Sequence, residues 1–169
     1  MCNGADMALK ILVLGVGNIL LSDEGVGVRA VEYLQKKHAV PDNVVLLDGG
    51  TMGMCLMDSL MDCDLLIVLD AVLGGGTPGS IYRLSGEDLR KSLSFRDSTH
   101  QTDLVDTLIC CELAGRRPEA VVLGMEPEDY TTLSTELTPR IAARLPCLCE
   151  AALEELRRNG VNLISADVV

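Results

Sequence analysis

Short apolar runs that end in glycine or aspartate alternate along this chain with stretches of helical periodicity. The runs at residues 10–16 (KILVLGV) and 64–69 are almost continuously apolar, which is typical of strands buried on both faces of a parallel sheet. Between them, apolar residues within 24–37 recur at the spacing of one helix face. The alternation predicts an α/β fold, in which helices cover both faces of a mostly parallel sheet.

The remaining segments continue this alternation. We expect the strand at 80–84 to lie at a sheet edge, because a turn-rich glycine loop precedes it. Thr138 followed by Pro139 is typical of a helix N-cap, and Pro146 is expected to kink or restart the helix that follows. The predicted strands are 10–16, 44–47, 64–69, 80–84 and 120–125, and the predicted helices are 24–37, 52–60, 102–113 and 139–158.

The length of 169 residues favours a single domain. We assign this domain to residues 9–160, with a flexible N-terminal extension at 1–8 and a C-terminal tail at 161–169. Hydrophobic residues make up 48% of the chain but aromatic residues only 2%. The core is therefore expected to consist of aliphatic side chains.

The net charge of −11 excludes several classes of partner. A chain this acidic repels phosphate backbones, so nucleic acids and anionic membrane surfaces are not expected to bind. No apolar run reaches the roughly 20 residues that span a bilayer. The seven cysteines form no Cys-x-x-Cys pair, which indicates reduced thiols of a cytoplasmic protein rather than a disulfide framework or a structural zinc site.

Acidic residues follow three successive predicted strands. Asp23 and Glu24 lie in the loop after the first strand, Asp48 ends the second and Asp70 ends the third. Ligands of parallel α/β sheets bind beyond the carboxyl ends of the strands, so we expect these carboxylates to meet at one edge. Asp48 alone is equally consistent with a residue that caps a turn before glycine.

The chain has two histidines, and only one is a candidate ligand or base. His38 ends a predicted helix, where an imidazole interacts favourably with the helix dipole. His100 lies just before a predicted helix start, and it is the imidazole that could join the carboxylates. Two carboxylates and one imidazole suit a divalent transition metal, and three protein ligands leave positions open for substrate.

Two other chemistries are less consistent with these residues. Gly15 and Gly17 follow a strand as in a dinucleotide fingerprint, but Leu20 replaces the third glycine and Glu24 adds negative charge where a pyrophosphate would bind. No nucleotide cofactor is therefore expected. A serine elbow is absent, and Cys110 and Cys111 fall inside a predicted helix, where thiols are usually inert.

Several ordered motifs make the chain resemble the hydrogenase maturation proteases over nearly its whole length. The most specific is ILVLGVGNILLSDEGVGVRAVEYL at residues 11–34. The other motifs are VVLLDGGTMGM at 44–54, LLIVLDAV at 65–72, THQ at 99–101 and ELTPR at 136–140.

This resemblance implies a three-layer α/β/α fold with a five-stranded sheet. It implies that Glu24, Asp70 and His100 bind nickel and that Asp48 has a role in catalysis. The substrate would be the large-subunit precursor of a [NiFe] hydrogenase, already loaded with nickel. The protein, acting as a monomer, would be an endopeptidase that removes the C-terminal extension of that precursor.

One segment departs from the family pattern, and the mechanism stays open. Many members follow the histidine with a Leu-Gly-Leu-like segment, whereas residues 101–104 read QTDL here, so helix entry and substrate contact around His100 are expected to differ. Nickel could act as a Lewis acid, or it could position the substrate while a carboxylate acts as general base. A metal-dependent chaperone that holds the precursor without cutting it needs the same three ligands.

Overall fold

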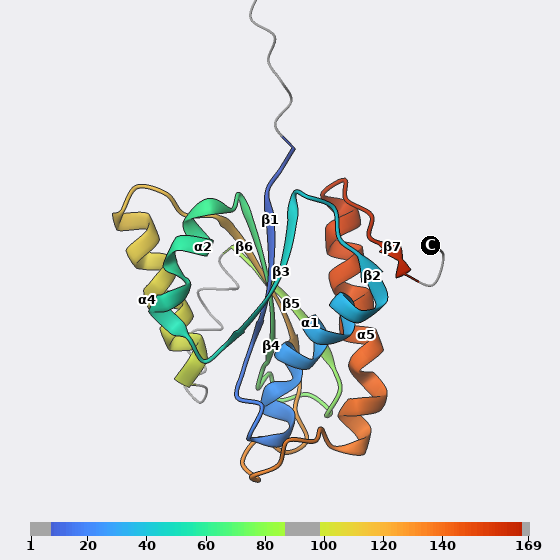
Figure 1. Cartoon of the computed structure of the whole chain (residues 1–169). Coiled ribbons are helices and arrows are strands. Elements are labelled where there is room, and N and C mark those ends of the chain that lie inside the picture. Colours follow the sequence, from blue (N-terminus) through green and yellow to red (C-terminus); the bar gives the residue numbers. More distant parts are fainter. Residues whose placement is uncertain (1–7, 87–98, 167–169) are drawn as a thin grey trace, which may run out of the picture.

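A five-stranded sheet forms the centre of the protein, with strand order β3-β1-β4-β6-β5 (Figure 1). The computed structural model describes residues 8–86 and 99–166. Neighbouring strands are parallel, except that β5 runs antiparallel to β6. The position of β5 at a sheet edge was expected, whereas its direction was not predicted. The strands are β1 (Ile11–Val16), β3 (Val44–Gly50), β4 (Leu65–Ala71), β5 (Ile81–Ser85) and β6 (Glu119–Met125).

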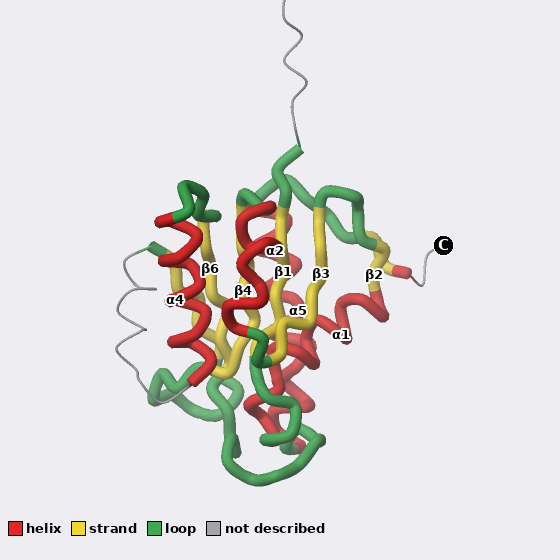
Figure 2. The backbone as a smooth tube through the Cα atoms, turned by 60° about the vertical axis from the view of Figure 1, so that its left-hand side comes forward, coloured by secondary structure: helices red, strands yellow, loops and turns green. Residues whose placement is uncertain are grey.

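Helices cover both faces of this sheet, which confirms the predicted three-layer α/β/α architecture. Figures 1 and 2 show two helices on each face: α1 (Val26–Lys37) and α5 (Pro139–Arg158) on one, and α2 (Met57–Asp62) and α4 (Thr99–Leu113) on the other. Short 3-10 turns, η1 (Ser22–Gly25) and η2 (Gly53–Leu56), precede α1 and α2. None of the helices in the described ranges is long and apolar enough to cross a membrane.

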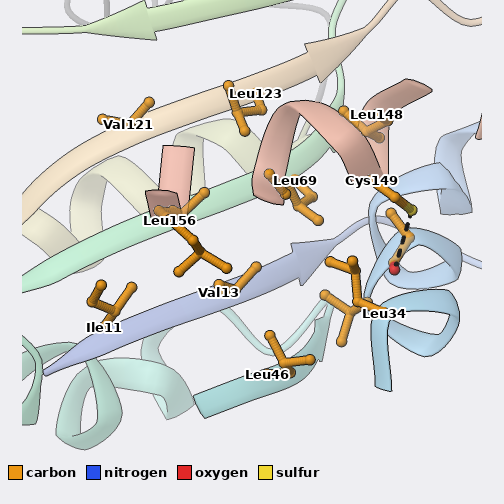
Figure 3. Packing of buried hydrophobic residues seen from close by; sticks show 14 of the residues in the cluster. Ile11, Val13, Leu34, Leu46, Leu69, Val121, Leu123, Leu148, Cys149 and Leu156 are labelled. Carbon is orange, nitrogen blue, oxygen red and sulfur yellow. Dashed lines mark hydrogen bonds between the residues drawn. The ribbon is translucent and has the colours of Figure 1, made fainter. Parts of the chain in front are cut away.

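The core divides into two aliphatic clusters, one on each face of the sheet. Side chains of β1 alternate between them, because successive strand residues point to opposite faces. Ile11 and Val13 pack toward α1 and α5, whereas Leu12 and Leu14 pack toward α2 and α4. Figure 3 shows the first cluster, in which branched aliphatic residues fill the space between sheet and helices. The expected aliphatic core is therefore present.

Two glycines bring α1 unusually close to the sheet. A Cβ at Gly27 would meet the carbonyl oxygens of Leu69 and Val16 at 2.0 and 2.5 Å, and a Cβ at Gly15 would meet the Gly27 carbonyl oxygen at 2.5 Å. Any larger residue would push the helix away from β1 and β4. This contact fixes the start of α1, and with it η1, against the ends of both strands.

The sequence predictions differ from the structure at several element ends. β3 and β4 run further than expected, so that Asp48 and Asp70 lie within strands rather than after them. The helix α4 begins at Thr99, so His100 lies in its first turn instead of before it. A small antiparallel pair, β2 (His38–Ala39) with β7 (Ile164–Ser165), was not predicted. Residues 1–7 of the expected extension are outside the described residues.

A restart or a kink was expected at Pro146. The restart was wrong, because α5 is assigned as one helix through this residue, and the kink stays a prediction. Proline removes one backbone donor from the helix interior, which is a local cost. On either side of it, α5 buries Ile141, Leu148, Ala152 and Leu156 against the sheet and α1. Continuous burial of this apolar face stabilises the helix enough to offset the missing hydrogen bond.

Candidate functional site at the carboxyl edge of the sheet

The strands β1, β3, β4 and β6 all end at the same edge of the sheet, the lower end in Figures 1 and 2. We call this end the carboxyl edge and the opposite end the amino edge. The carboxyl edge is where the topology of a parallel sheet is expected to place a ligand. The acidic residues predicted to meet there can each be placed in the structure.

Asp70 is the buried carboxylate of the group, with an exposed fraction of only 3%. It lies in the central strand β4, and its Oδ1 accepts a hydrogen bond from the Ala71 backbone N–H at 2.8 Å. By strand alternation it shares a face with Leu66 and Val68, which belong to the cluster under α2 and α4. A carboxylate held this far from water must be stabilised by other polar or charged groups.

Glu24 lies in η1, between the end of β1 and the start of α1. The turn that leads to it depends on Gly17, where φ is +132° and a Cβ would be 2.0 Å from the Glu24 carbonyl oxygen. The side chain is half-buried, and its Oε2 is inaccessible to solvent. Because α1 packs tightly on β1 and β4, the position of Glu24 relative to the end of β4 is fixed by the backbone.

His100 is brought to the same edge by the direction of α4. The far end of this helix leads into β6 at the amino edge, where Glu119 N–H donates to the Asp64 carbonyl at 2.9 Å. The first turn of α4 therefore lies toward the carboxyl edge (Figure 1). The side chain of His100, and those of residues 101–103 after it, are outside the described set.

Asp48 is the exposed acidic residue of the second strand. It pairs with Gly15 of β1, which in turn pairs with Leu69 of β4. The Cα atoms of Asp48 and Asp70 are thus at nearly the same level of the sheet, two strand spacings or about 10 Å apart. By strand alternation Asp48 points to the face covered by α1 and α5, opposite to the face of Asp70. The Asp48 Oδ1 accepts the Gly50 backbone N–H at 2.9 Å, which is the turn-capping contact that its sequence context also suggested.

The sequence treated Asp23 and Glu24 as one acidic pair, but the structure gives them different surroundings. Asp23 is fully buried and accepts hydrogen bonds from the backbone N–H groups of Glu128, Asp129 and Thr138 and from the Thr138 hydroxyl, at 2.7–3.0 Å. It ties η1 to the loop 126–138 and to the start of α5. Its partners lie more than 100 residues away, so no local signal could have identified this role.

Glu126 was missed, although it follows β6 just as the other acids follow their strands. It is 7% exposed, and its Oε2 accepts from Gly74 N–H, Gly76 N–H and the Tyr82 hydroxyl at 2.8, 3.2 and 2.7 Å. The bond to Glu126, with burial, raises the pKa of Tyr82. Glu126 thereby holds the glycine loop that follows Asp70. The rule that picked out Asp70 would also have found it.

Three buried cysteines, Cys63, Cys111 and Cys149, have the properties of inert thiols. Burial raises the pKa of the Cys63 thiol to about 11 and that of Cys149 to about 12, and it also raises the pKa of Cys111. Deprotonation is needed before sulfur acts as a nucleophile or metal ligand. These three thiols are therefore protonated at neutral pH.

Among the side chains that the structure describes, no three histidine, cysteine, aspartate or glutamate residues are grouped closely enough to hold a metal ion. The imidazole of His100 is not one of those side chains. The donor set that the backbone brings to this edge, two carboxylates with one imidazole, is one that binds divalent transition metals. The chemistry of these three side chains therefore fits nickel, the metal that the sequence predicts.

Comparisons with known proteins point to one family. A family profile described as hydrogenase maturation protease matches residues 28–155. The hydrogenase 2 maturation protease of Escherichia coli (strain K12) is 38% identical over 163 residues, covering 95% of this chain and 99% of the relative. The hydrogenase expression/formation protein HupD of Rhodobacter capsulatus is 38% identical over 167 residues, covering 95% and 80%.

Solved structures give the same result. The hydrogenase maturating endopeptidase HybD from E. coli superposes with a TM-score of 0.90 at 37% identity, covering 95% of this chain and 100% of that one. The [NiFe] hydrogenase maturation protease HybD from Thermococcus kodakarensis superposes with a TM-score of 0.72 at 25% identity, covering 88% and 99%.

Proposed function

The chain belongs to the hydrogenase maturation protease family and is an endopeptidase, and from this premise we propose that it removes the C-terminal extension from the nickel-loaded large-subunit precursor of a [NiFe] hydrogenase. The reaction is hydrolysis of one peptide bond: water adds to the scissile carbonyl, the C–N bond breaks, and the leaving amine gains a proton.

The observation that carries this proposal is the position of Asp70. Asp70 is 3% exposed, and it lies in the central strand next to the carboxyl edge. Charged groups buried in this way are concentrated at functional sites. Glu24 in η1 and His100 in the first turn of α4 are the other two ligands that we propose, and their elements lie toward the same edge.

We assign recognition of the precursor's nickel to Glu24, Asp70 and His100. The carboxylates supply negative charge, and a neutral imidazole nitrogen supplies a donor that suits nickel. The metal is part of the substrate, so that a precursor without nickel would present nothing for these ligands to bind. The three residues would thereby make cleavage conditional on metal insertion.

We assign proton transfer to Asp48. Of the acidic residues at the carboxyl ends of the described strands, it is the exposed one, and its Cα lies about 10 Å from that of Asp70 across the sheet. A general base must contact the attacking water, which an exposed carboxylate can do. The raised thiol pKa values of Cys63, Cys111 and Cys149 support hydrolysis by water rather than by a cysteine nucleophile.

We also propose that the protein acts as a monomer in the cytoplasm. All six cysteines of the described residues are free thiols, as in a reducing compartment. Light scattering on a size-exclusion column tests the first point, and a dimer at micromolar concentration would contradict it.

The direct test is to incubate the purified protein with nickel-loaded precursor and to search for the released peptide by mass spectrometry. The expected result is one cut near the C-terminus and a shortened large subunit. Binding of the precursor without any released peptide would instead indicate a chaperone that holds the precursor.

A further inference from the structure

Exposed apolar side chains gather on the loops of the carboxyl edge. They come from the loop after β1, from the segment after β3 and from the loop 126–138 after β6. Leu20 is 51% exposed and Leu133 is 80% exposed, although a leucine side chain is more stable away from water. We call this group the apolar rim, and it consists of Ile19, Leu20, Met52, Met54, Tyr130 and Leu133.

The loops that carry the rim are held by hydrogen bonds. The Ser134 N–H donates to the Leu20 carbonyl at 3.0 Å, and the Ser22 N–H donates to the Ser134 carbonyl at 2.8 Å. The Gly17 N–H donates to the Gly50 carbonyl at 3.0 Å, which ties the first loop to the end of β3. Leu20 and Leu133 therefore lie beside each other on loops that backbone hydrogen bonds hold in place. These hydrogen bonds keep both side chains exposed.

The loop segments of the rim carry acidic side chains, and arginines of the neighbouring helices contact these segments. Arg29 of α1 donates to the Thr135 carbonyl oxygen at 2.9 Å, and Arg144 of α5 donates to the Gly79 carbonyl oxygen at 3.3 Å. Residues 17–25, 48–56, 70–79 and 126–138 contain no lysine or arginine. Their acidic residues include Glu128 and Asp129, which lie in the same loop as Leu133. Hydrogen bonds from Thr132 and Thr131 lower the pKa of Asp129 to about 2, so that this carboxylate is charged at all ordinary pH values. Arg140, from the first turn of α5, pairs with Glu128 at 3.4 Å.

We propose that the apolar rim binds the C-terminal segment of the precursor around its cleavage site, as an extended peptide with aliphatic side chains flanked by lysine or arginine. This inference rests on the proposed function. An exposed apolar surface that is surrounded by charged residues marks a protein-binding site. The acidic side chains next to the apolar rim favour a basic partner. A second copy of this chain, with its charge of −11, would be repelled, as would an anionic membrane.

The experiment measures binding by calorimetry with nickel-free precursor, which the proposed function leaves uncut. The variant is Leu20→Ser with Leu133→Ser, and the control is Leu113→Ser. Leu113 is 82% exposed, as Leu133 is at 80%, but it ends α4 at the amino edge. We expect the double variant to bind about tenfold more weakly or worse, as for loss of interface anchors, and the control to match the wild type within about twofold. Circular dichroism confirms that each variant is folded.

Two further titrations identify the occupant. Mature large subunit, which lacks the extension, is expected to bind at least about tenfold more weakly than precursor, and high salt is expected to weaken precursor binding severalfold. If the mature subunit binds as tightly as the precursor, the C-terminal extension is not what the apolar rim binds. If salt does not weaken binding, the bound segment is not basic.

The outcomes separate this inference from the proposed function. If the double variant binds precursor as tightly as the wild type, or if the wild type binds no nickel-free precursor, the rim is not the docking surface, whatever the cleavage assay shows. If the wild type binds precursor through the rim but never cuts the nickel-loaded form, the proposed function fails and the docking surface stands.

Discussion

The two ends of the central sheet differ in how their charges are used. At the amino edge, opposite charges are paired on the surface: Lys10 contacts Asp62 at 3.0 Å, and Arg116 contacts Asp64 at 3.2 Å. At the carboxyl edge, the four loop segments around the site hold carboxylates and exposed apolar residues without a lysine or arginine of their own. Exposed ion pairs of this kind contribute little to the free energy of unfolding. Acidic side chains of the loops next to a buried carboxylate instead favour binding of a cationic group.

The largest expected effect on stability comes from removing Asp23, which supports the carboxyl edge from inside. Asp23→Ala leaves three backbone N–H groups and one hydroxyl without their acceptor in the interior. We expect the free energy of unfolding to fall by about 3–5 kcal/mol, since each lost bond to a charged acceptor contributes roughly 1–3 kcal/mol and the losses are not additive. Urea denaturation followed by circular dichroism measures this change.

The adjacent residue provides the matched control, because Glu24→Gln alters the site and not this support. Its stability should remain within about 1 kcal/mol of the wild type. A Glu24→Gln variant that unfolds as readily as Asp23→Ala would show that the two carboxylates have the same structural role.

The next largest effect is on catalysis. Asp70→Asn and Glu24→Gln keep side-chain size but remove a charged ligand, so we expect the rate of cleavage of nickel-loaded precursor to fall at least about a hundredfold. Gel electrophoresis of the processed subunit over time gives the rate. Cleavage by either variant within about threefold of the wild-type rate would remove that residue from the site.

A smaller effect is expected at the glycine loop. Tyr82→Phe removes the 2.7 Å hydrogen bond to the buried Glu126 carboxylate, which should cost about 1–2 kcal/mol of stability. The raised pKa of Tyr82 gives this contribution a pH dependence. It is fully present below the unfolded tyrosine pKa of about 10 and is lost as pH rises through the folded pKa. Denaturation from pH 8 to 11 should therefore show wild type and variant converging at high pH.

The smallest effect is predicted for the amino edge. Asp62→Asn breaks the exposed pair with Lys10, and we expect Tm to stay within about 2 °C of the wild type and cleavage to be unchanged. Calorimetry and the cleavage assay check both. A strong loss of cleavage activity in this variant would contradict the claim that only the carboxyl edge takes part in catalysis.

The parts of the molecule that sequence predicted well are those where one local pattern determines the outcome. The run at 65–69 is apolar on both faces, so it could only be a buried central strand, and Asp70 then had to lie at its carboxyl end. Side chains that act over long range were not predictable. Asp23 contacts residues 105–115 positions away, and β2 pairs with β7 through two residues only.

Element ends were predicted less well, because tertiary packing decides them. The helix α5 passes through Pro146 since apolar burial on both sides outweighs one missing hydrogen bond. Asp48 is extended as part of β3 because that strand continues to pair with β1 beyond the apolar run. The ligand role of His100 stays a prediction, since the backbone places its turn but its side chain is outside the described residues.

The most direct test of the nickel-recognition site compares nickel-loaded with nickel-free precursor, using the wild type, His100→Ala and His38→Ala. His38 caps α1, with its Nδ1 3.3 Å from the Leu34 carbonyl oxygen, and it is the control histidine. We predict that the wild type and His38→Ala cut only the loaded precursor and that His100→Ala cuts neither form. Normal cleavage by His100→Ala, or equally fast processing of nickel-free precursor by the wild type, would contradict the account.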